Sequence, residues 1–340
     1  MADFDALVVA RALTGGMGVH AFDADLREQR AACFAGAMAG DQLTELIDLA
    51  ALEDLLASGT LPLTSVDLYQ DGHLIRLADM QKKSGKSGLA LVAERFHDGA
   101  TIRLRDIDRV DRRLGEFAAA VRSTFSAGSQ INVYLTPPAK AGFPPHFDIT
   151  DVFIVQCLGR KQWHVYTDYT SRVDLPLAET NWEPDRFRPV GSPDVMTLSA
   201  GDVLYLPRGV MHEAFCTDRA SMHLTISITP LTFVDLLARE LQRAAAADVR
   251  FRRRVPWSFE GDAPDVSARI ADTARECLQR LAAQIDVAAT VAEERRTMQA
   301  DGPASRERVG LSDAIGHLFD PMSRAESPVS AGHADSPGTA

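Results

Sequence analysis

The sequence predicts a mainly β fold with flanking helices, built around an antiparallel sandwich or barrel of the jelly-roll type. Short runs rich in β-branched and aromatic residues, separated by Pro, Gly and Asp turns, predict the strands. These runs are residues 129–135, 153–158, 162–166, 203–206 and 222–228. Few helical patterns lie between them, which argues against a parallel sheet with crossover helices.

A His-x-Asp pair, His146 and Asp148, lies inside an otherwise apolar stretch with the character of a strand. Residues two apart on a strand project to the same face, so the imidazole and the carboxylate should converge while Phe147 turns away. His212 follows a predicted strand and a Pro-Arg-Gly turn much further along the chain. Two histidines and one carboxylate, with other coordination positions open, are typical of non-haem Fe(II) oxygenases. The alternative is a hydrogen-bonded polar cluster in the core.

The patterns on either side of the strands predict four parts. Residues 1–125 contain helices and short strands that support the barrel, 126–232 form the jelly-roll core, 233–301 are helical, and 302–340 are a short segment and a disordered tail. One long helix is expected over 265–301, with an apolar stripe at steps of three and four: Val266, Ile270, Ala274, Cys277, Leu281 and Ile285. Such a stripe needs a partner surface. Packing on the barrel is one solution, and pairing with a second copy, which predicts a homodimer, is the one favoured here.

Smaller elements can also be placed. Apolar residues at helical spacing predict two helices within 43–59, with Asp48 as the cap of the second. The pair Asp71-Gly72 predicts a β-hairpin, and an amphipathic helix is expected over 106–125. Residues 167–197 are interpreted as a long insertion near the opening of the site.

Composition and charge limit the partners. A chain of 340 residues with 46% hydrophobic content can bury a large core. The net charge of −11 argues against direct nucleic-acid binding and against anionic membranes. The N-terminus lacks the basic start and apolar core of a signal peptide, and no apolar run has membrane-spanning length, so a cytoplasmic location is expected.

Lys161 is a candidate for the interior, because alternation places it on one strand face with Trp163 and Val165. A lysine among apolar neighbours needs a buried anion, since an unpaired buried charge is costly. The alternative is an edge-strand lysine that faces solvent. His223 and Thr225 share a face of the last predicted strand, where they either line the pocket or are ordinary polar residues of the barrel.

Five motifs together resemble one family. NVYLTPP, PPHFD, DVFIVQCLGRKQWHVY, GDVLYLPRGVMHE and MHLTISI resemble the motifs of JmjC-type ribosomal oxygenases, which are 2-oxoglutarate-dependent hydroxylases of ribosomal-protein side chains. The resemblance covers about residues 25–260 and follows the family's order. It implies a double-stranded β-helix of the cupin/JmjC type and a C-terminal helical dimerisation region. The run HFDITDVF departs from the more acidic HYDD-type run common in the family.

The resemblance also implies roles for individual residues. His146, Asp148 and His212 would hold Fe(II), and Lys161 would pair with the distal carboxylate of 2-oxoglutarate. Tyr134, Asn132 and Thr225 complete the expected co-substrate site, of which the first two match family positions.

The implied activity is hydroxylation of a protein or peptide side chain, with a ribosomal-protein type of substrate favoured. Fe(II), 2-oxoglutarate and O2 would be required, and succinate and CO2 would be produced. One alternative is a JmjC lysine demethylase, which is less favoured because the accessory elements look like those of the ribosomal oxygenases. Another is a cupin-like metal-binding or sensing module without turnover. The expected partners are the protein substrate and a second copy of the chain.

Overall fold

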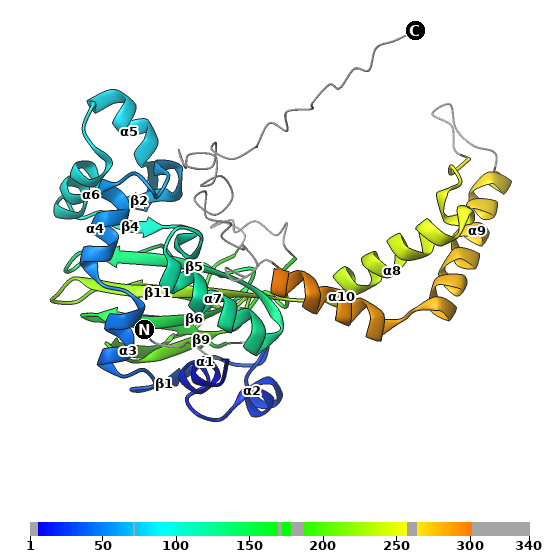
Figure 1. Ribbon diagram of the computed structural model, residues 1–340, viewed down its shortest axis with the longest axis horizontal. Coiled ribbons are helices and arrows are strands. Elements are labelled where there is room, and N and C mark those ends of the chain that lie inside the picture. The colour runs from blue at the N-terminus through cyan, green and yellow to red at the C-terminus, as the bar shows by residue number, and fades with distance from the viewer. Residues whose placement is uncertain (1–5, 71, 169–171, 178–186, 257–263, 301–340) are drawn as a thin grey trace, which may run out of the picture. The chain divides into compact units, whose positions relative to one another are not determined.

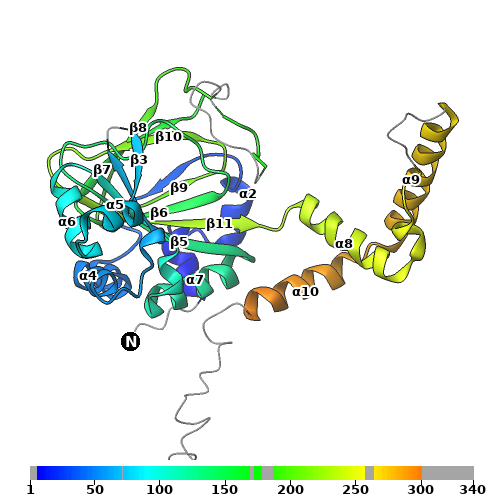
Figure 2. The same cartoon turned by 90° about the horizontal axis from the view of Figure 1, so that it is seen from above.

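The computed structural model describes residues 6–70, 72–168, 172–177, 187–256 and 264–300. Within them, a large antiparallel sheet faces a smaller one, and helices cover the other side of the large sheet (Figures 1 and 2). The predicted mainly β fold with flanking helices is therefore confirmed.

The large sheet has eight strands in the order β1-β9-β6-β11-β5-β4-β2-β3, and every neighbouring pair is antiparallel. Its strands are β1 (Ala32–Phe34), β2 (Val66–Gln70), β3 (His73–Arg76), β4 (Thr101–Leu104), β5 (Ala127–Thr136), β6 (Asp151–Leu158), β9 (Val203–Leu206) and β11 (Ser221–Pro230). The small sheet has the order β10-β7-β8, with β7 (Arg160–Tyr166), β8 (Asp194–Ser199) and β10 (Met211–Phe215). The five strands predicted between residues 129 and 228 are present, whereas β1, β4, β8 and β10 were not predicted individually. Because β8 begins at Asp194, the expected insertion over 167–197 is shorter than the sequence suggested, and 169–171 and 178–186 within it lie outside the described residues.

Successive side chains of β6 point to opposite faces of the sheet, so the strand contributes to two apolar cores. Phe153 and Val155 belong to the large cluster that includes side chains of α7 (Arg112–Phe125), whereas Ile154 packs with Trp163 of the small sheet. The cavity described below lies on the second side, between the sheets. A strand that buries both faces reads as a continuous apolar run, as the sequence DVFIVQCL does.

The other N-terminal helices are α1 (Ala6–Leu13), α2 (Val19–Asp25), α3 (Gly40–Leu46), α4 (Leu49–Ala57), α5 (Leu77–Ser84) and α6 (Gly88–His97). The cap at Asp48 is confirmed, since its Oδ1 accepts the Ala51 N–H at 2.7 Å. The hairpin of β2 and β3 is confirmed as well, with Gly72 at φ +80° in the turn; residue 71 lies outside the described residues. The helix expected from 106 begins only at Arg112, because Asp106 has a left-handed backbone that interrupts it and Asp111 caps the new start.

Among the described residues, three α-helices follow β11: α8 (Phe233–Ala247), α9 (Pro264–Gln284) and α10 (Val287–Ala300). The single long helix expected over 265–301 is wrong, because Asp286 ends it and caps α10 by accepting the Ala289 N–H at 3.0 Å. Buried Glu240 of α8 explains the break, since it accepts hydrogen bonds from the Asp286 N–H and the Thr290 hydroxyl and so holds α10 on α8. None of the helices in the described ranges has the length and apolarity needed to cross a membrane. The predicted tail at 302–340 lies outside the described residues.

Candidate functional site

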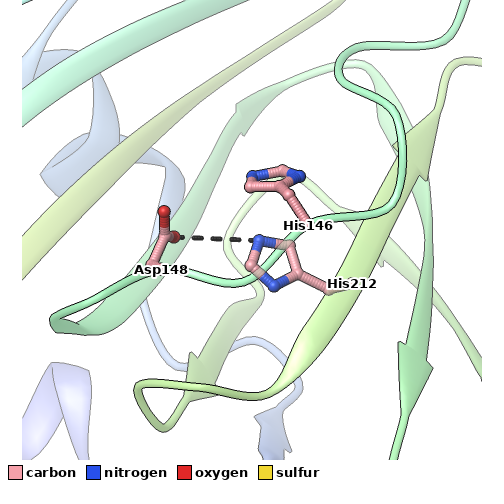
Figure 3. Close-up of side chains that lie close together, drawn as sticks. All are labelled: His146, Asp148 and His212. Carbon is pink, nitrogen blue, oxygen red and sulfur yellow. Dashed lines mark ion pairs between the residues drawn. The ribbon is translucent and has the colours of Figure 1, made fainter. Parts of the chain in front are cut away.

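His146, Asp148 and His212 come together in the folded chain, as Figure 3 shows. One potential ligand atom from each lies within 4.8 Å of the others. Asp148 Oδ2 is 3.7 Å from His212 Nε2, and the two imidazole centroids are 4.5 Å apart. Of the side chains that the structure describes, only these three form a His, Cys, Asp and Glu group of metal-binding geometry. The convergence predicted from the sequence is therefore present, and the role of the group as a metal centre stays a prediction.

The backbone around His146 is not the regular strand that the sequence suggested. His146 and His212 exchange two hydrogen bonds, of 3.0 and 2.7 Å, in an isolated β-bridge, and a second bridge joins Ala141 to Phe215. Between these bridges Pro144 and Pro145 have no N–H to donate to a ladder, which explains why no continuous strand forms. Phe147 still turns away from the site into a separate apolar cluster.

Each histidine is oriented by a backbone carbonyl. His146 Nδ1 lies 2.9 Å from Pro144 O, and His212 Nδ1 lies 2.9 Å from Val210 O. Because a carbonyl can only accept, each Nδ1 carries a proton, and the lone pair of the neutral ring is then on Nε2. Burial and the neighbouring His146 lower the pKa of His212, which keeps this imidazole neutral. Neutral rings with a fixed tautomer are the form in which histidine binds a metal ion.

The turn before His212 is tied to the segment that carries Asp148. Gly209 N–H donates to Asp148 O at 2.8 Å, and its own carbonyl accepts from Val173 N–H at 3.0 Å. Gly209 has φ +82°, and a Cβ there would lie 1.8 Å from Val173 O, so no other residue fits. The buried carboxylate of Asp151 accepts the Arg208 N–H at 2.9 Å and anchors the same turn to β6.

The three residues open into a cavity whose empty space, including the solvent at its mouth, is about 410 Å³. Besides the triad, its polar lining consists of Tyr134, Lys161, His223 and Thr225. The sequence analysis did not single out Phe143, whose ring also lines the cavity, 5.4 Å from the His146 ring. Phe143 lies between a glycine and a proline, in a segment without a periodic pattern of apolar residues. The local sequence therefore did not indicate which way its side chain points.

Lys161 lies in the interior at 2% exposure, as alternation along β7 predicted. The edge-strand alternative is wrong, because β7 pairs with β10 on one side and β8 on the other. Its Nζ donates to Thr136 Oγ1 at 3.0 Å and lies 5.7 Å from the centre of the Trp163 ring. Within the described ranges it has no carboxylate partner, and burial lowers its pKa to about 8. The ammonium is thus still mostly protonated at neutral pH, and its charge is available to an anion in the cavity.

Tyr134 and His223 form a stacked pair on one wall of the cavity. Their ring centroids are 4.9 Å apart and their planes differ by 3°. His223 is 2% exposed and its Nδ1 has no hydrogen-bond partner among the described residues, while burial and Lys161 lower its pKa well below the ordinary value. Thr225 lines the cavity as expected, but Asn132 does not belong to the lining, because its Oδ1 accepts the Asp106 N–H at 3.1 Å.

The part of the chain that forms this site is similar to a known protein family. Residues 104–236 match the family model described as the JmjC domain. This part of the chain is similar to a JmjC domain. The matched residues run from the end of β4 into α8 and include the triad, Lys161 and the stacked pair.

The relatives confirm the resemblance to JmjC-type ribosomal oxygenases that the motifs indicated. The chain is 35% identical over 165 residues to the bifunctional lysine-specific demethylase and histidyl-hydroxylase NO66 of Dictyostelium discoideum. This alignment covers 47% of this chain and 31% of that protein. The chain is also 36% identical over 172 residues to ribosomal oxygenase 1 of Homo sapiens, and that alignment covers 48% of this chain and 26% of that protein. The chain therefore spans about a third or less of the length of these relatives.

Among solved structures, the chain is similar to the ribosomal oxygenase YcfD of Escherichia coli. The TM-score is 0.48 at 16% identity, and the similarity covers 79% of this chain and 67% of that one.

Proposed function

We propose that this protein is an Fe(II)- and 2-oxoglutarate-dependent hydroxylase of a protein or peptide side chain, with a ribosomal-protein substrate favoured. The observation that carries the proposal is the distribution of charge in one cavity. Two histidines and a carboxylate converge on one part of the lining, and a buried lysine without a carboxylate partner in the described structure lines the same space. A dicarboxylate fits both features, because one end can chelate a metal ion held by the triad and the other end can pair with the Lys161 ammonium.

The residues present fit Fe(II). His146 and His212 offer Nε2 lone pairs and Asp148 offers a carboxylate oxygen, which is the donor set of non-haem Fe(II) sites. Iron bound there would supply the redox chemistry that couples conversion of 2-oxoglutarate and O2 into succinate and CO2 to the insertion of one oxygen atom into a C–H bond.

The chain's own side chains bind and orient the co-substrate in this proposal. Lys161 neutralises the distal carboxylate, because an unpaired charge would be costly at this burial. Tyr134 and Thr225 offer hydroxyl donors from neighbouring strands of the large sheet. Phe143 and Trp163 supply apolar walls that exclude water, which strengthens each of these electrostatic contacts.

Two other functions remain as alternatives. A demethylase is favoured by one observation, the name of the Dictyostelium relative, which joins lysine demethylation and histidyl hydroxylation in one protein. Its product would lose a methyl group, whereas hydroxylation adds one oxygen atom. A cupin-like metal-binding module would release no succinate at all.

The test is succinate release by the purified full chain supplied with Fe(II), 2-oxoglutarate and O2, with His146→Ala as the inactive control. Turnover that requires all three supports the proposal, and its absence in the wild type favours the non-catalytic module. The substrate is then sought by mass spectrometry of the proteome, and of its ribosomal proteins first, in cells with and without this protein. A lost oxygen addition identifies a hydroxylation substrate, and retained methyl groups in the deletion identify a demethylation substrate.

The remaining parts of the proposal concern organisation and partners. The four-part division at residues 125, 232 and 301 is supported by the change from strands to helices after β11. A homodimer through the C-terminal helices is supported by exposed apolar side chains on α8. We also propose a cytoplasmic location, and the charge of −11 supports a protein that does not bind nucleic acid directly.

A further inference from the structure

A row of polar side chains crosses the large sheet from β3 to the cavity. Arg76 lies opposite Asp67, Asp67 opposite Arg103, Arg103 opposite Tyr134, and Tyr134 opposite His223. Residues directly opposite each other on neighbouring strands project to the same face, so the five side chains form one continuous line. Only its last two members line the cavity.

Asp67 anchors the row. Its carboxylate is 1% exposed, and Arg103 donates to Oδ2 through Nη2 at 2.6 Å and Nε at 3.2 Å. Arg105 also reaches Oδ2, at 3.0 Å, and Arg76 lies 3.6 Å from Oδ1. A buried carboxylate held by several guanidinium groups has a fixed position, so it fixes the Arg103 side chain in turn.

Arg103 touches the outer side of the cavity wall. Its guanidinium carbon lies 5.6 Å from the centre of the Phe143 ring and 5.3 Å from that of Tyr69. Burial raises the pKa of Tyr134 to about 12, and Arg103 opposes this shift through its charge and a side-chain hydrogen bond. Arg103 also lies directly opposite Tyr134 in the register of β4 and β5, and the Tyr134 ring stacks on His223 inside the cavity.

We propose that Arg103 is a positioning residue for the co-substrate site, and that it acts through the hydroxyl of Tyr134. This inference rests on the proposed function. When the guanidinium donates to the Tyr134 oxygen, the phenolic O–H is left to donate into the cavity. Hydrogen bonds in a chain polarise one another, so the phenol becomes a stronger donor to an anionic ligand. The buried Asp67 and its arginines thus support co-substrate binding from outside the lining.

A purely structural role makes a different prediction. If Arg103 only joined β2, β4 and β5, its loss would lower stability and would weaken every ligand regardless of residue 134. Arg105 provides the matched control, because it carries the same charge and contacts the same Asp67 oxygen but has no cross-strand contact with Tyr134.

The experiment measures binding of 2-oxoglutarate to the Mn(II)-loaded full chain by calorimetry, with thermal melts for every variant. The variants are Arg103→Met, Arg103→Lys, Arg105→Met, Tyr134→Phe and the double variant Arg103→Met/Tyr134→Phe. Arg103→Met should weaken 2-oxoglutarate about tenfold, the size typical of a hydrogen bond that involves a charged group, while Mn(II) affinity stays unchanged. Arg103→Lys should recover part of the loss, and Arg105→Met should change the affinity less than about twofold.

The double variant decides between the two roles. If Arg103 acts through the Tyr134 hydroxyl, Arg103→Met should have almost no further effect in the Tyr134→Phe background. An undiminished effect in that background, or an equal loss in Arg105→Met, would overturn the inference. Should Arg103→Met not fold, Arg103→Lys is compared with and without Tyr134→Phe in the same way. A wild type that binds no 2-oxoglutarate contradicts the proposed function, whereas a wild type that binds it as tightly as Arg103→Met contradicts the inference alone.

Discussion

Lys161 is the single residue on which co-substrate affinity is expected to depend most. It is the cation of the cavity lining, and removing one member of a buried ion pair costs ~3–5 kcal/mol because the other charge is left unpaired. Lys161→Ala should therefore weaken 2-oxoglutarate by roughly two to three orders of magnitude, at ~1.4 kcal/mol per tenfold. Lys161→Arg should recover part of this loss, since the charge survives in a different geometry. The measurement is a 2-oxoglutarate titration of the Mn(II) form, and wild-type affinity in Lys161→Ala would remove the lysine from the site.

The same lysine predicts a pH dependence. Burial lowers the pKa of Lys161 to about 8 in the site without an anion, so the ammonium is charged below this pH and neutral above it. Affinity for 2-oxoglutarate should fall as the pH rises through about 8, because binding then requires uptake of a proton. Calorimetry across this range is the measurement. The Lys161→Arg variant should show no such fall, since a guanidinium keeps its proton; an equal fall in both proteins would assign the titration to another group.

Metal binding should depend on the triad alone. His146→Ala and Asp148→Ala should each abolish stoichiometric Mn(II) binding, because two remaining ligands do not hold this ion well. Glu213→Ala is the control: it removes a carboxylate next to His212 that accepts a hydrogen bond from the Tyr166 hydroxyl and is not part of the triad. Mn(II) stoichiometry is read by equilibrium dialysis. Full occupancy in both triad variants would show that the ion binds elsewhere.

At the scale of elements, the turn before β10 positions His212 and Asp148 together. Gly209→Ala should unfold more easily and bind Mn(II) more weakly, because the new Cβ would meet Val173 O at 1.8 Å and displace the turn. Gly59→Ala is the matched control, since Gly59 also has a positive φ, of +71°, but no atom of the described residues lies within 4 Å of its Cβ position. The control should cost ~1–2 kcal/mol of backbone strain, and Gly209→Ala at least ~2 kcal/mol more. Urea denaturation measures the change in the free energy of unfolding for both variants. Equal changes would contradict the prediction, because they would mean that the turn accommodates the Cβ of residue 209 without loss of stability.

At the scale of the whole molecule, we expect a dimer through α8. This helix exposes Phe233 (83%), Val234 (67%), Leu237 (45%) and Leu241 (46%), which lie on one side at helical spacing. An apolar surface of this kind is commonly covered by a second copy related by a twofold axis. Light scattering should therefore give twice the chain mass of 37.0 kDa. The double variant Leu237→Glu/Leu241→Glu should be monomeric, while Leu7→Glu, at an exposed leucine of α1, should not change the mass; a wild type at the chain mass would exclude the dimer.

The sequence alone determined much of the strand-rich core and most of the polar residues of the candidate site. The five strands predicted between residues 129 and 228 are present, and Lys161 faces inward, because side-chain alternation along a strand is a local pattern of period two. The triad was recognisable because His146 and Asp148 are close in the chain and His212 follows a recognisable strand and turn.

Only the tertiary structure decided how these parts meet. The segment around His146 is held by an isolated bridge to His212 instead of a strand, and the predicted long helix breaks at Asp286 because a buried carboxylate on α8 binds its backbone. Arg103 reaches Tyr134 only because β4 pairs with β5 in one particular register. Contacts between residues far apart in the chain leave no periodic signal in either segment, so their consequences appear only after the chain has folded.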